Sequence, residues 1–194
     1  MARKKGLQFY QKEKKINSAL LKDIFEMIVG TFIVLFLAIA LTHFAGMRTS
    51  VVGDSMEPVL YNGQEILINR FIYGISSPKR GDVVVFLPNG NQNTHYYVKR
   101  IVGLPGETVQ IINGRLYIDG EMLEEEAPYD KIIDPGIAEN EITLESDEYF
   151  VLGDNRNSSE DSRSGNIGAV EKSTIIGKAW FHLKCEESTM GFVE

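Results

Sequence analysis

Three short segments of this chain hold polar residues within sequence that is otherwise suited to packing or turning. They are residues 51–58, a strand expected over residues 96–102, and residues 153–163. In the first segment, Ser55 follows an expected strand and a glycine turn, where a hydroxyl is displayed and nearby backbone N–H groups are free to bind an oxyanion. Gly53-Asp54-Ser55 is also a common turn sequence, so the tripeptide alone is a weak indication of catalysis.

The second segment carries two cations, Lys99 and Arg100, in the middle of its strand. Successive side chains of a strand point to opposite faces, so each face bears one cation among apolar residues. A lysine in such a strand usually lies at a sheet edge or extends its ammonium to solvent. If the ammonium is buried, desolvation lowers its pKa and the neutral amine can act as a general base. Both interpretations of Lys99 are open at this point.

Histidine is the usual base beside a catalytic serine, and the chain contains His43, His95 and His182. His43 lies at the end of an apolar segment, where a polar interfacial residue is common. His95 shares a strand face with Lys99, but four residues along a strand span roughly 13 Å. One serine hydroxyl therefore cannot contact both side chains, and only one of the two can be its base.

Taken together, the three segments resemble a known family, the type I signal peptidases, whose catalytic pair is serine and lysine. Residues 55–60 resemble its nucleophile box, residues 80–86 its next strand, residues 97–107 its lysine box and residues 153–163 its closing box. The four motifs occur in the family's order and cover the chain from about residue 49 to 170. Val59 stands where a threonine is common, and residues 164–168 replace the usual aromatic-glycine. These departures affect local loop geometry and leave Ser55 and Lys99 in place.

The resemblance implies a catalytic role for two residues and supporting roles for others. Ser55 would attack the scissile carbonyl while neutral Lys99 takes its proton and later passes one to the leaving amine. Ser159 would orient the Lys99 amine. The backbone N–H of Ser55 would bind the oxyanion, and Gly53 stands where some relatives carry a serine that supplies a second donor. This chemistry requires no metal and no other cofactor.

The resemblance further implies two supporting ion pairs, Asp154 with Arg100 and Asp161 with Arg163. It also implies shallow apolar cups for the small residues at the −1 and −3 positions of a signal peptide. Core packing is the alternative interpretation of each residue that would line these substrate-binding cups. By their motif positions, these residues are Val51, Val52, Met56, Leu60, Val85, Tyr97 and Val98.

The elements that must position these residues begin with an apolar segment near the N-terminus. Residues 27–44 are 18 residues without Asp, Glu, Lys or Arg, long enough for a helix that spans a bilayer. Seven Lys/Arg precede this segment, whereas only Arg48 closely follows it. The positive-inside bias therefore predicts a basic cytoplasmic head over residues 1–23, a transmembrane helix over residues 24–46 and an extracytoplasmic remainder at the cell membrane.

The apolar segment has two other interpretations. A cleaved signal peptide is suggested by the small-x-small triplet at residues 38–40, but the apolar run is longer than the roughly 7–15 residues of a signal peptide. A buried core helix is the second alternative. The length of the run and of the basic head favours the retained membrane anchor.

Residues 47–184 are expected to form a mainly β peptidase domain. Short β-branched runs punctuated by Gly, Pro and Asn predict eight strands, without helical periodicity between them. This pattern predicts an antiparallel β-barrel or folded-sheet domain. Asn113-Gly114 between two of the runs predicts a tight hairpin turn. The expected strands are residues 49–52, 65–69, 83–87, 96–102, 108–112, 115–118, 149–152 and 175–181.

The net charge of −7 is unevenly distributed along the chain. The first 23 residues are net +5, and the remainder holds 13 basic and 25 acidic residues, net −12, which argues against nucleic acid as a partner. Residues 119–148 carry 12 of the acidic residues against Lys131 alone, which predicts a solvated peripheral excursion without chemistry. The single Cys185 excludes an internal disulfide, and residues 185–194 are expected to be a polar tail.

The sequence therefore predicts a membrane-bound serine endopeptidase that removes N-terminal signal peptides from exported preproteins through Ser55, Lys99 and an acyl-enzyme intermediate. Its expected partners are signal peptides and the lipid bilayer. A non-catalytic, membrane-anchored assembly factor is one alternative, disfavoured because both Ser55 and Lys99 are present. A self-cleaving regulator with a related serine–lysine fold is another, disfavoured by the membrane segment and the absence of a DNA-binding segment.

Overall fold

The computed structural model describes residues 18–45, 47–90, 95–125 and 127–193, and the chain divides into two units, residues 1–40 and 41–194. The first unit consists of most of helix α1 (Ser18–Ala45). Residues 18–40 of this helix are predominantly apolar and none of them is buried, so the helix is long and apolar enough to cross a membrane by length and composition. The basic head expected over residues 1–23 lies largely outside the described residues.

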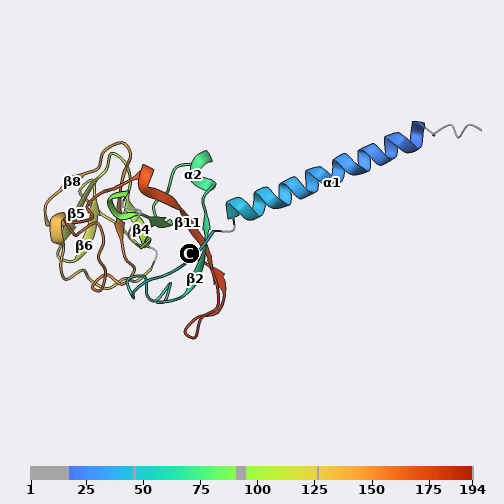
Figure 1. The fold of residues 1–194 in the computed structure, drawn as a ribbon. Coiled ribbons are helices and arrows are strands. Elements are labelled where there is room, and N and C mark those ends of the chain that lie inside the picture. The colour runs from blue at the N-terminus through green and yellow to red at the C-terminus, as the bar shows by residue number, and fades with distance from the viewer. Residues whose placement is uncertain (1–17, 46, 91–94, 126, 194) are drawn as a thin grey trace, which may run out of the picture. The chain divides into compact units, whose positions relative to one another are not determined.

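The second unit is built on a large antiparallel sheet (Figure 1). Its strands follow the spatial order β1-β2-β11-β3-β4-β9-β10, and β12 pairs with β11. In Figure 1, β2 and β11 lie at one end of this unit and β4 lies between them and the second sheet. The strands are β1 (Met47–Ser50), β2 (Glu65–Asn69), β3 (Val83–Phe86), β4 (Tyr97–Gly103), β9 (Glu148–Leu152), β10 (Val170–Glu171), β11 (Ile175–His182) and β12 (Gly191–Phe192).

A second, smaller sheet has the order β7-β6-β5-β8. It consists of β5 (Thr108–Ile112), β6 (Arg115–Ile118), β7 (Glu121–Met122) and β8 (Ile142–Thr143). Ile112 pairs with Arg115, so Asn113 and Gly114 form a two-residue turn, with φ angles of 51° and 76°. Both angles are positive, as a primed hairpin turn requires, and the predicted hairpin is confirmed.

Short helical turns complete the second unit. They are α2 (Ile72–Ile75) and the 3₁₀ turns η1 (Pro88–Gly90), η2 (Gly136–Glu139) and η3 (Lys172–Thr174). All pairings in both sheets are antiparallel, so the prediction of a mainly β, antiparallel folded-sheet domain is confirmed. The described ends of the large sheet are β1 and β10, so it is a curled open sheet.

The centre of the large sheet is covered on both faces. Every residue of β3 is buried, and alternate residues enter different hydrophobic clusters: Val83 and Val85 join one, Val84 and Phe86 another. In β4, Val98, Lys99 and Arg100 are all buried. A sheet covered on both faces explains the continuous apolar run of β3, and it leaves the two cations of β4 inside the protein.

The structure differs from the expected strands mainly at two-residue elements. Strands β7, β8, β10 and β12 were not predicted, and β12 lies in the segment expected to be a polar tail. The acidic segment of residues 119–148 contains β7, η2 and β8, and it buries Ile132, Ala138 and Leu144 in the cluster beneath the small sheet. The segment is therefore partly packed into the core and not only a solvated excursion.

Candidate active site

The turn between β1 and β2 displays Ser55. Val51 donates its N–H to the Gln64 carbonyl at 2.9 Å, and Gly63 donates to the Val51 carbonyl at 2.8 Å, which closes the base of the turn. Gly53 adopts a φ of 83°, a left-handed conformation that glycine reaches without strain. Met56, the residue after Ser55, is fully buried in the core. A half-exposed serine is thus fixed between a glycine turn and a core anchor.

Lys99 of β4 reaches this serine. Its Nζ lies 2.6 Å from the Ser55 Oγ, and its side chain is only 4% exposed. Burial lowers the pKa of Lys99 to about 8, against an ordinary value near 10.5, while the charges of Asp161 and Glu160 raise it in part. A buried amine in contact with a hydroxyl is an arrangement that can deprotonate that hydroxyl.

The Ser55–Lys99 pair opens onto a cavity of about 280 Å³. Apolar side chains from the nucleophile turn and from β4 supply one part of its wall, and polar residues of the closing segment, residues 153–163, supply another. The lining residues are Val51, Val52, Gly53, Asp54, Ser55, His95, Tyr96, Tyr97, Val98, Lys99, Ser158 and Glu160. The pair is therefore reachable from solvent through a partly apolar opening.

Arg100, the neighbour of Lys99 on β4, forms a buried ion pair. Its Nε donates to Asp154 Oδ1 at 2.8 Å and its Nη2 donates to Asp154 Oδ2 at 2.7 Å. Its Nη1 donates to the Gly81 carbonyl at 2.8 Å. This bidentate pair ties β4 to the start of the closing segment.

A second buried ion pair lies within the closing segment. Arg163 donates from Nε to Asp161 Oδ1 and from Nη2 to Asp161 Oδ2, both at 2.8 Å. Asp161 Oδ2 also accepts the backbone N–H of Gly153 at 3.1 Å. The segment is therefore folded back on itself around Asp161.

The closing segment also contacts the nucleophile turn directly. Asn155 donates its backbone N–H to the Ser55 carbonyl at 3.0 Å and its side-chain Nδ2 to the Asp54 carbonyl at 3.2 Å. At Gly153, any Cβ would collide with the Ser55 carbonyl oxygen and with the Ser159 Oγ. Gly153 is thus needed for this close approach.

Comparisons with known proteins agree with these motifs. Residues 24–183 match the family described as signal peptidase, peptidase S26. The chain belongs to this family. It is 34% identical over 175 residues to signal peptidase I P of Bacillus subtilis subsp. natto, covering 87% of this chain and 91% of that protein. It is 37% identical to a signal peptidase I of Bacillus amyloliquefaciens, covering 88% of this chain and 92% of the relative.

Among solved structures, a signal peptidase I from Enterococcus faecalis aligns with 54% of this chain and 97% of its own, at 32% identity and a TM-score of 0.43. Membership of the signal peptidase family makes this chain a hydrolase of the serine peptidase type. The expected family resemblance and enzyme class are confirmed.

In this signal peptidase, four of the seven expected substrate-binding residues line the cavity beside Ser55 and Lys99: Val51, Val52, Tyr97 and Val98. The other three, Met56, Leu60 and Val85, are fully buried in the cluster that also contains Val51 and Val98. They therefore contribute to the cavity through the residues against which they pack.

The expected supporting residues lie together in this signal peptidase, with one difference at Ser159. Its Oγ is buried and makes no hydrogen bond to any residue within the described ranges. Asn155, by contrast, lies in the closing box, and the family resemblance implies no role for it. Its two hydrogen bonds to the nucleophile turn form only because folding brings the closing segment against that turn. No local sequence pattern predicts them.

The histidines occupy three different positions in the signal peptidase. His95 is exposed and lines the same cavity as Lys99. His182 Nδ1 lies 2.9 Å from the Gln64 Nε2, within the packing of β11. The side chain of His43 lies outside the described residues.

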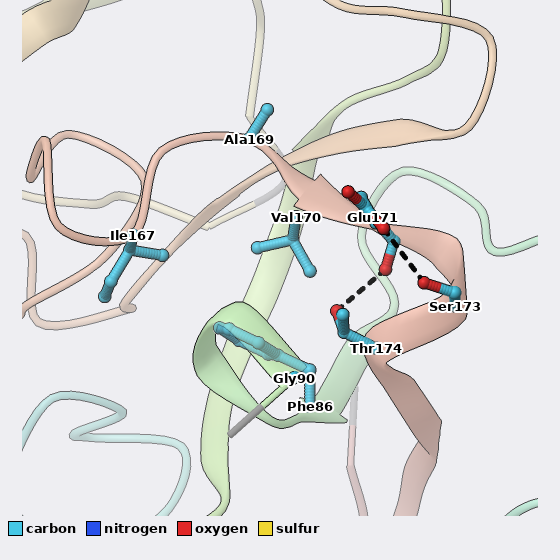
Figure 2. A pocket seen from close by; sticks show the side chains of 8 residues that line it. All are labelled: Phe86, Gly90, Ile167, Ala169, Val170, Glu171, Ser173 and Thr174. Carbon is cyan, nitrogen blue, oxygen red and sulfur yellow. Dashed lines mark hydrogen bonds between the residues drawn. The ribbon is translucent and has the colours of Figure 1, made fainter.

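A further cavity, of about 400 Å³, lies between β3, η1 and the β10–η3 segment (Figure 2). Its polar groups are already bonded: Ser173 Oγ donates to Glu171 Oε2 at 3.0 Å, and Thr174 Oγ1 donates to the Glu171 carbonyl at 2.8 Å. Neither Ser55 nor Lys99 lines it. Within the described residues no group of three or more His, Cys, Asp or Glu could hold a metal ion.

Proposed function

We propose that this signal peptidase is a membrane-bound endopeptidase that cleaves N-terminal signal peptides from exported preproteins through a Ser55/Lys99 dyad and an acyl-enzyme intermediate. The observation that carries the proposal is the 2.6 Å contact between Lys99 Nζ and Ser55 Oγ in a site where the lysine is 4% exposed. The names of the relatives, all signal peptidases I, support the substrate class.

The first half of the reaction is acylation. The neutral amine of Lys99 takes the Ser55 hydroxyl proton as Oγ forms a bond to the scissile carbonyl carbon, and the carbonyl oxygen becomes an oxyanion. The lysine ammonium then gives this proton to the leaving nitrogen as the C–N bond breaks, which leaves an ester on Ser55 and a free amine on the mature protein.

The depressed pKa makes this step accessible near neutral pH. With a pKa of about 8, about one Lys99 in ten is neutral at pH 7, against roughly one in three thousand for an ordinary lysine. In the second half, Lys99 takes a proton from water as the water oxygen attacks the ester carbonyl. The proton returns to Ser55 Oγ as the ester bond breaks, which releases the signal peptide with a free carboxyl group.

The oxyanion needs a hydrogen-bond donor at the nucleophile. The backbone N–H of Ser55 donates to none of the residues that the structure describes, so it is available to a bound carbonyl oxygen. Gly53 has no side chain, so a hydroxyl donor from that position is absent. We therefore assign the Ser55 N–H as the oxyanion donor.

Recognition of small residues would use the apolar part of the cavity. Alternate side chains of an extended substrate point the same way, so the −1 and −3 residues would face the cavity together. Val51, Val52 and Val98 supply apolar contacts there.

Helix α1 would be the membrane anchor. Its residues 27–44 carry no Asp, Glu, Lys or Arg, and residues 1–23 are net +5, so the positive-inside bias favours a cytoplasmic N-terminus. Ser55 follows Phe44 by 11 residues, a tether of at most about 40 Å. The dyad would then act on substrates held in the same membrane.

The test is cleavage of a preprotein by the detergent-solubilised full chain, with the new N-terminus sequenced. We expect cleavage after a small-x-small triplet, and loss of cleavage by at least about a thousandfold in Ser55→Ala and in Lys99→Ala. Ser146→Ala and Lys184→Ala replace an exposed serine and an exposed lysine and are the matched controls.

Full cleavage by either dyad variant would contradict the dyad. If the unaltered chain does not cut any preprotein but binds a membrane-anchored partner, the non-catalytic assembly factor is correct. If it cuts only its own chain, the self-cleaving regulator is correct. Each alternative therefore has its own outcome in the same experiment.

A further inference from the structure

We propose that the hydrogen bond between Tyr97 and Glu160 is a latch over the dyad lysine, and that Glu160 is a positioning residue for Lys99. The Tyr97 Oη donates to Glu160 Oε2 at 3.0 Å. The inference rests on the proposed dyad and adds a role for Glu160, a closing-box residue for which the family resemblance implies none.

Tyr97 covers the lysine amine from within the same strand. The two residues are two apart on β4 and so share a face, and the Lys99 Nζ lies 5.5 Å from the centroid of the Tyr97 ring. Both side chains line the dyad cavity. The ring is one of the groups that keeps Lys99 4% exposed although Ser55, its hydrogen-bond partner, is half-exposed.

The Tyr97 ring is held at two places. Phe86, fully buried on the neighbouring strand β3, contacts it edge-on, with ring centroids 6.0 Å apart and an interplanar angle of 62°. Phe86 also lines the cavity of Figure 2, so this contact connects the two cavities along one face of the sheet. The hydrogen bond from Tyr97 to Glu160 is the second point, and it is the one that breaks without disturbing the core.

Glu160 is well placed to anchor this bond. Its neighbour Asp161 is locked by the bidentate pair with Arg163, so the backbone at residue 160 is fixed. Its own side chain is exposed, lines the dyad cavity and also lines the adjoining cavity that contains Ser159 and Arg163. The bond therefore joins β4 to the closing segment across the entrance to the dyad.

The carboxylate of Glu160 also acts on the charge of Lys99. Burial lowers the pKa of Lys99, whereas the charges of Asp161, Glu160 and Asp154 raise it and that of Arg163 lowers it. On the neighbouring strand β3, the residue opposite Lys99 is Val84, which carries no charge. The other titratable groups that line the dyad cavity are Asp54, His95, Tyr96 and Tyr97.

Two conservative variants separate the hydrogen bond from the charge. Glu160→Gln keeps an oxygen acceptor for the Tyr97 hydroxyl and removes the negative charge. Tyr97→Phe keeps the ring and the charge and removes the hydrogen bond. Glu121→Gln, an exposed glutamate on β7, and Tyr117→Phe on β6 are the matched controls.

The experiment measures kcat and KM against pH for cleavage of a preprotein by the full chain. For Glu160→Gln we expect the acid limb of the profile to move to lower pH, because Lys99 loses a neighbouring negative charge. For Tyr97→Phe we expect kcat to fall by roughly three- to tenfold, the factor that one hydrogen bond is worth, with little change in KM. The controls should match the unaltered chain.

A second measurement does not depend on activity. The amines are dimethylated with ¹³C-formaldehyde in the Ser55→Ala background, and the Lys99 resonance, assigned by its loss in Lys99→Arg, is followed against pH by NMR. A lower titration midpoint with Glu160→Gln supports the proposed action of Glu160 on Lys99 even where no preprotein is cut. The same midpoint with and without Glu160→Gln, or an unchanged kcat in Tyr97→Phe, overturns it.

Discussion

Lys99 and Arg100 are neighbours on β4, and both are buried, with 4% and 8% of their surface exposed. Arg100 meets both oxygens of Asp154 at hydrogen-bond distance. Lys99 has a hydroxyl, Ser55 Oγ, as its hydrogen-bond partner, and the nearby carboxylates act on it through their charge. Of these two adjacent buried cations, Arg100 is therefore paired with a carboxylate, whereas Lys99 is hydrogen-bonded to a hydroxyl.

The difference indicates which cation is structural and which is available for chemistry. A buried charge is costly unless it is paired in good geometry, and Arg100 meets that condition. A guanidinium also keeps its proton throughout the accessible pH range, whereas a buried ammonium gives up its proton more readily. Under the proposed dyad, the strand uses arginine where a charge must persist and lysine where a proton must move.

Exchanging one cation for the other is the most severe test of this comparison. Lys99→Arg retains a positive charge of similar reach but cannot supply a neutral base. We expect kcat/KM for preprotein cleavage to fall by at least about a thousandfold at pH 8, within the range that a general base contributes. Circular dichroism should show an unchanged strand content.

Lys184→Arg is the matched control, because Lys184 is exposed. Cleavage by Lys99→Arg within tenfold of the unaltered chain would show that position 99 supplies charge and not a base. The two cations of β4 would then be alike in function, and another residue would have to deprotonate Ser55.

Breaking the Arg100 pair should instead act on folding. Arg100→Met leaves Asp154 buried without its partner, which costs about 3–5 kcal/mol of unfolding free energy. Urea unfolding of the full chain in detergent, followed by the fluorescence of Trp180, the single tryptophan, measures this loss. Arg100→Met combined with Asp154→Leu should recover most of it, because neither charge of this pair then remains buried without its partner. A double variant no more stable than the single one would contradict a simple ion pair.

Much of the large-scale architecture is predictable from local pattern. Asn113-Gly114 predicts its hairpin because only certain residues accept two positive φ angles, and the expected strands recur within a few residues. The two-residue strands β7, β8, β10 and β12 were missed because two residues contain no periodicity. They exist because tertiary packing brings their backbones beside longer strands.

Less of the candidate site than of the fold can be predicted from the sequence. Alternation along β4 separates Lys99 from Arg100, but it does not show that Lys99 is buried, because burial depends on what covers that face. The Tyr97 ring covers part of this face, but its partner Glu160 lies 63 residues from it and Ser55 lies 44 residues from Lys99. The collision that excludes a side chain at Gly153 is likewise set by the approach of Ser55. Contacts between residues so far apart in the sequence produce no periodic pattern from which they could be predicted.

The burial of Lys99 should also make the unfolding free energy depend on pH. Its folded pKa of about 8 lies below the ordinary 10.5, so between these values the unfolded chain binds more protons and stability rises with pH. The rise amounts to about 3 kcal/mol across this window. Lys99→Met lacks this titration, so it should be more stable than the unaltered chain at pH 7, with the advantage shrinking toward pH 10.5.

Urea midpoints of the two proteins at a series of pH values measure this effect. Other titrating groups are common to both, so they cancel in the difference. A difference that stays constant between pH 7 and pH 10.5 would mean that Lys99 titrates alike in the folded and unfolded chain, and the contrast with Arg100 would lose its energetic basis.

The smallest expected effect concerns His95, the other base on the same cavity. His95 is exposed and precedes β4, whereas Lys99 is buried within the strand and in contact with Ser55. If Lys99 is the base, His95→Ala should change kcat/KM by less than about twofold. The acid limb of the pH profile should remain near the Lys99 pKa of about 8. Loss of that limb in His95→Ala would instead assign the proton transfer to a histidine, and the buried lysine would be a second structural cation beside Arg100.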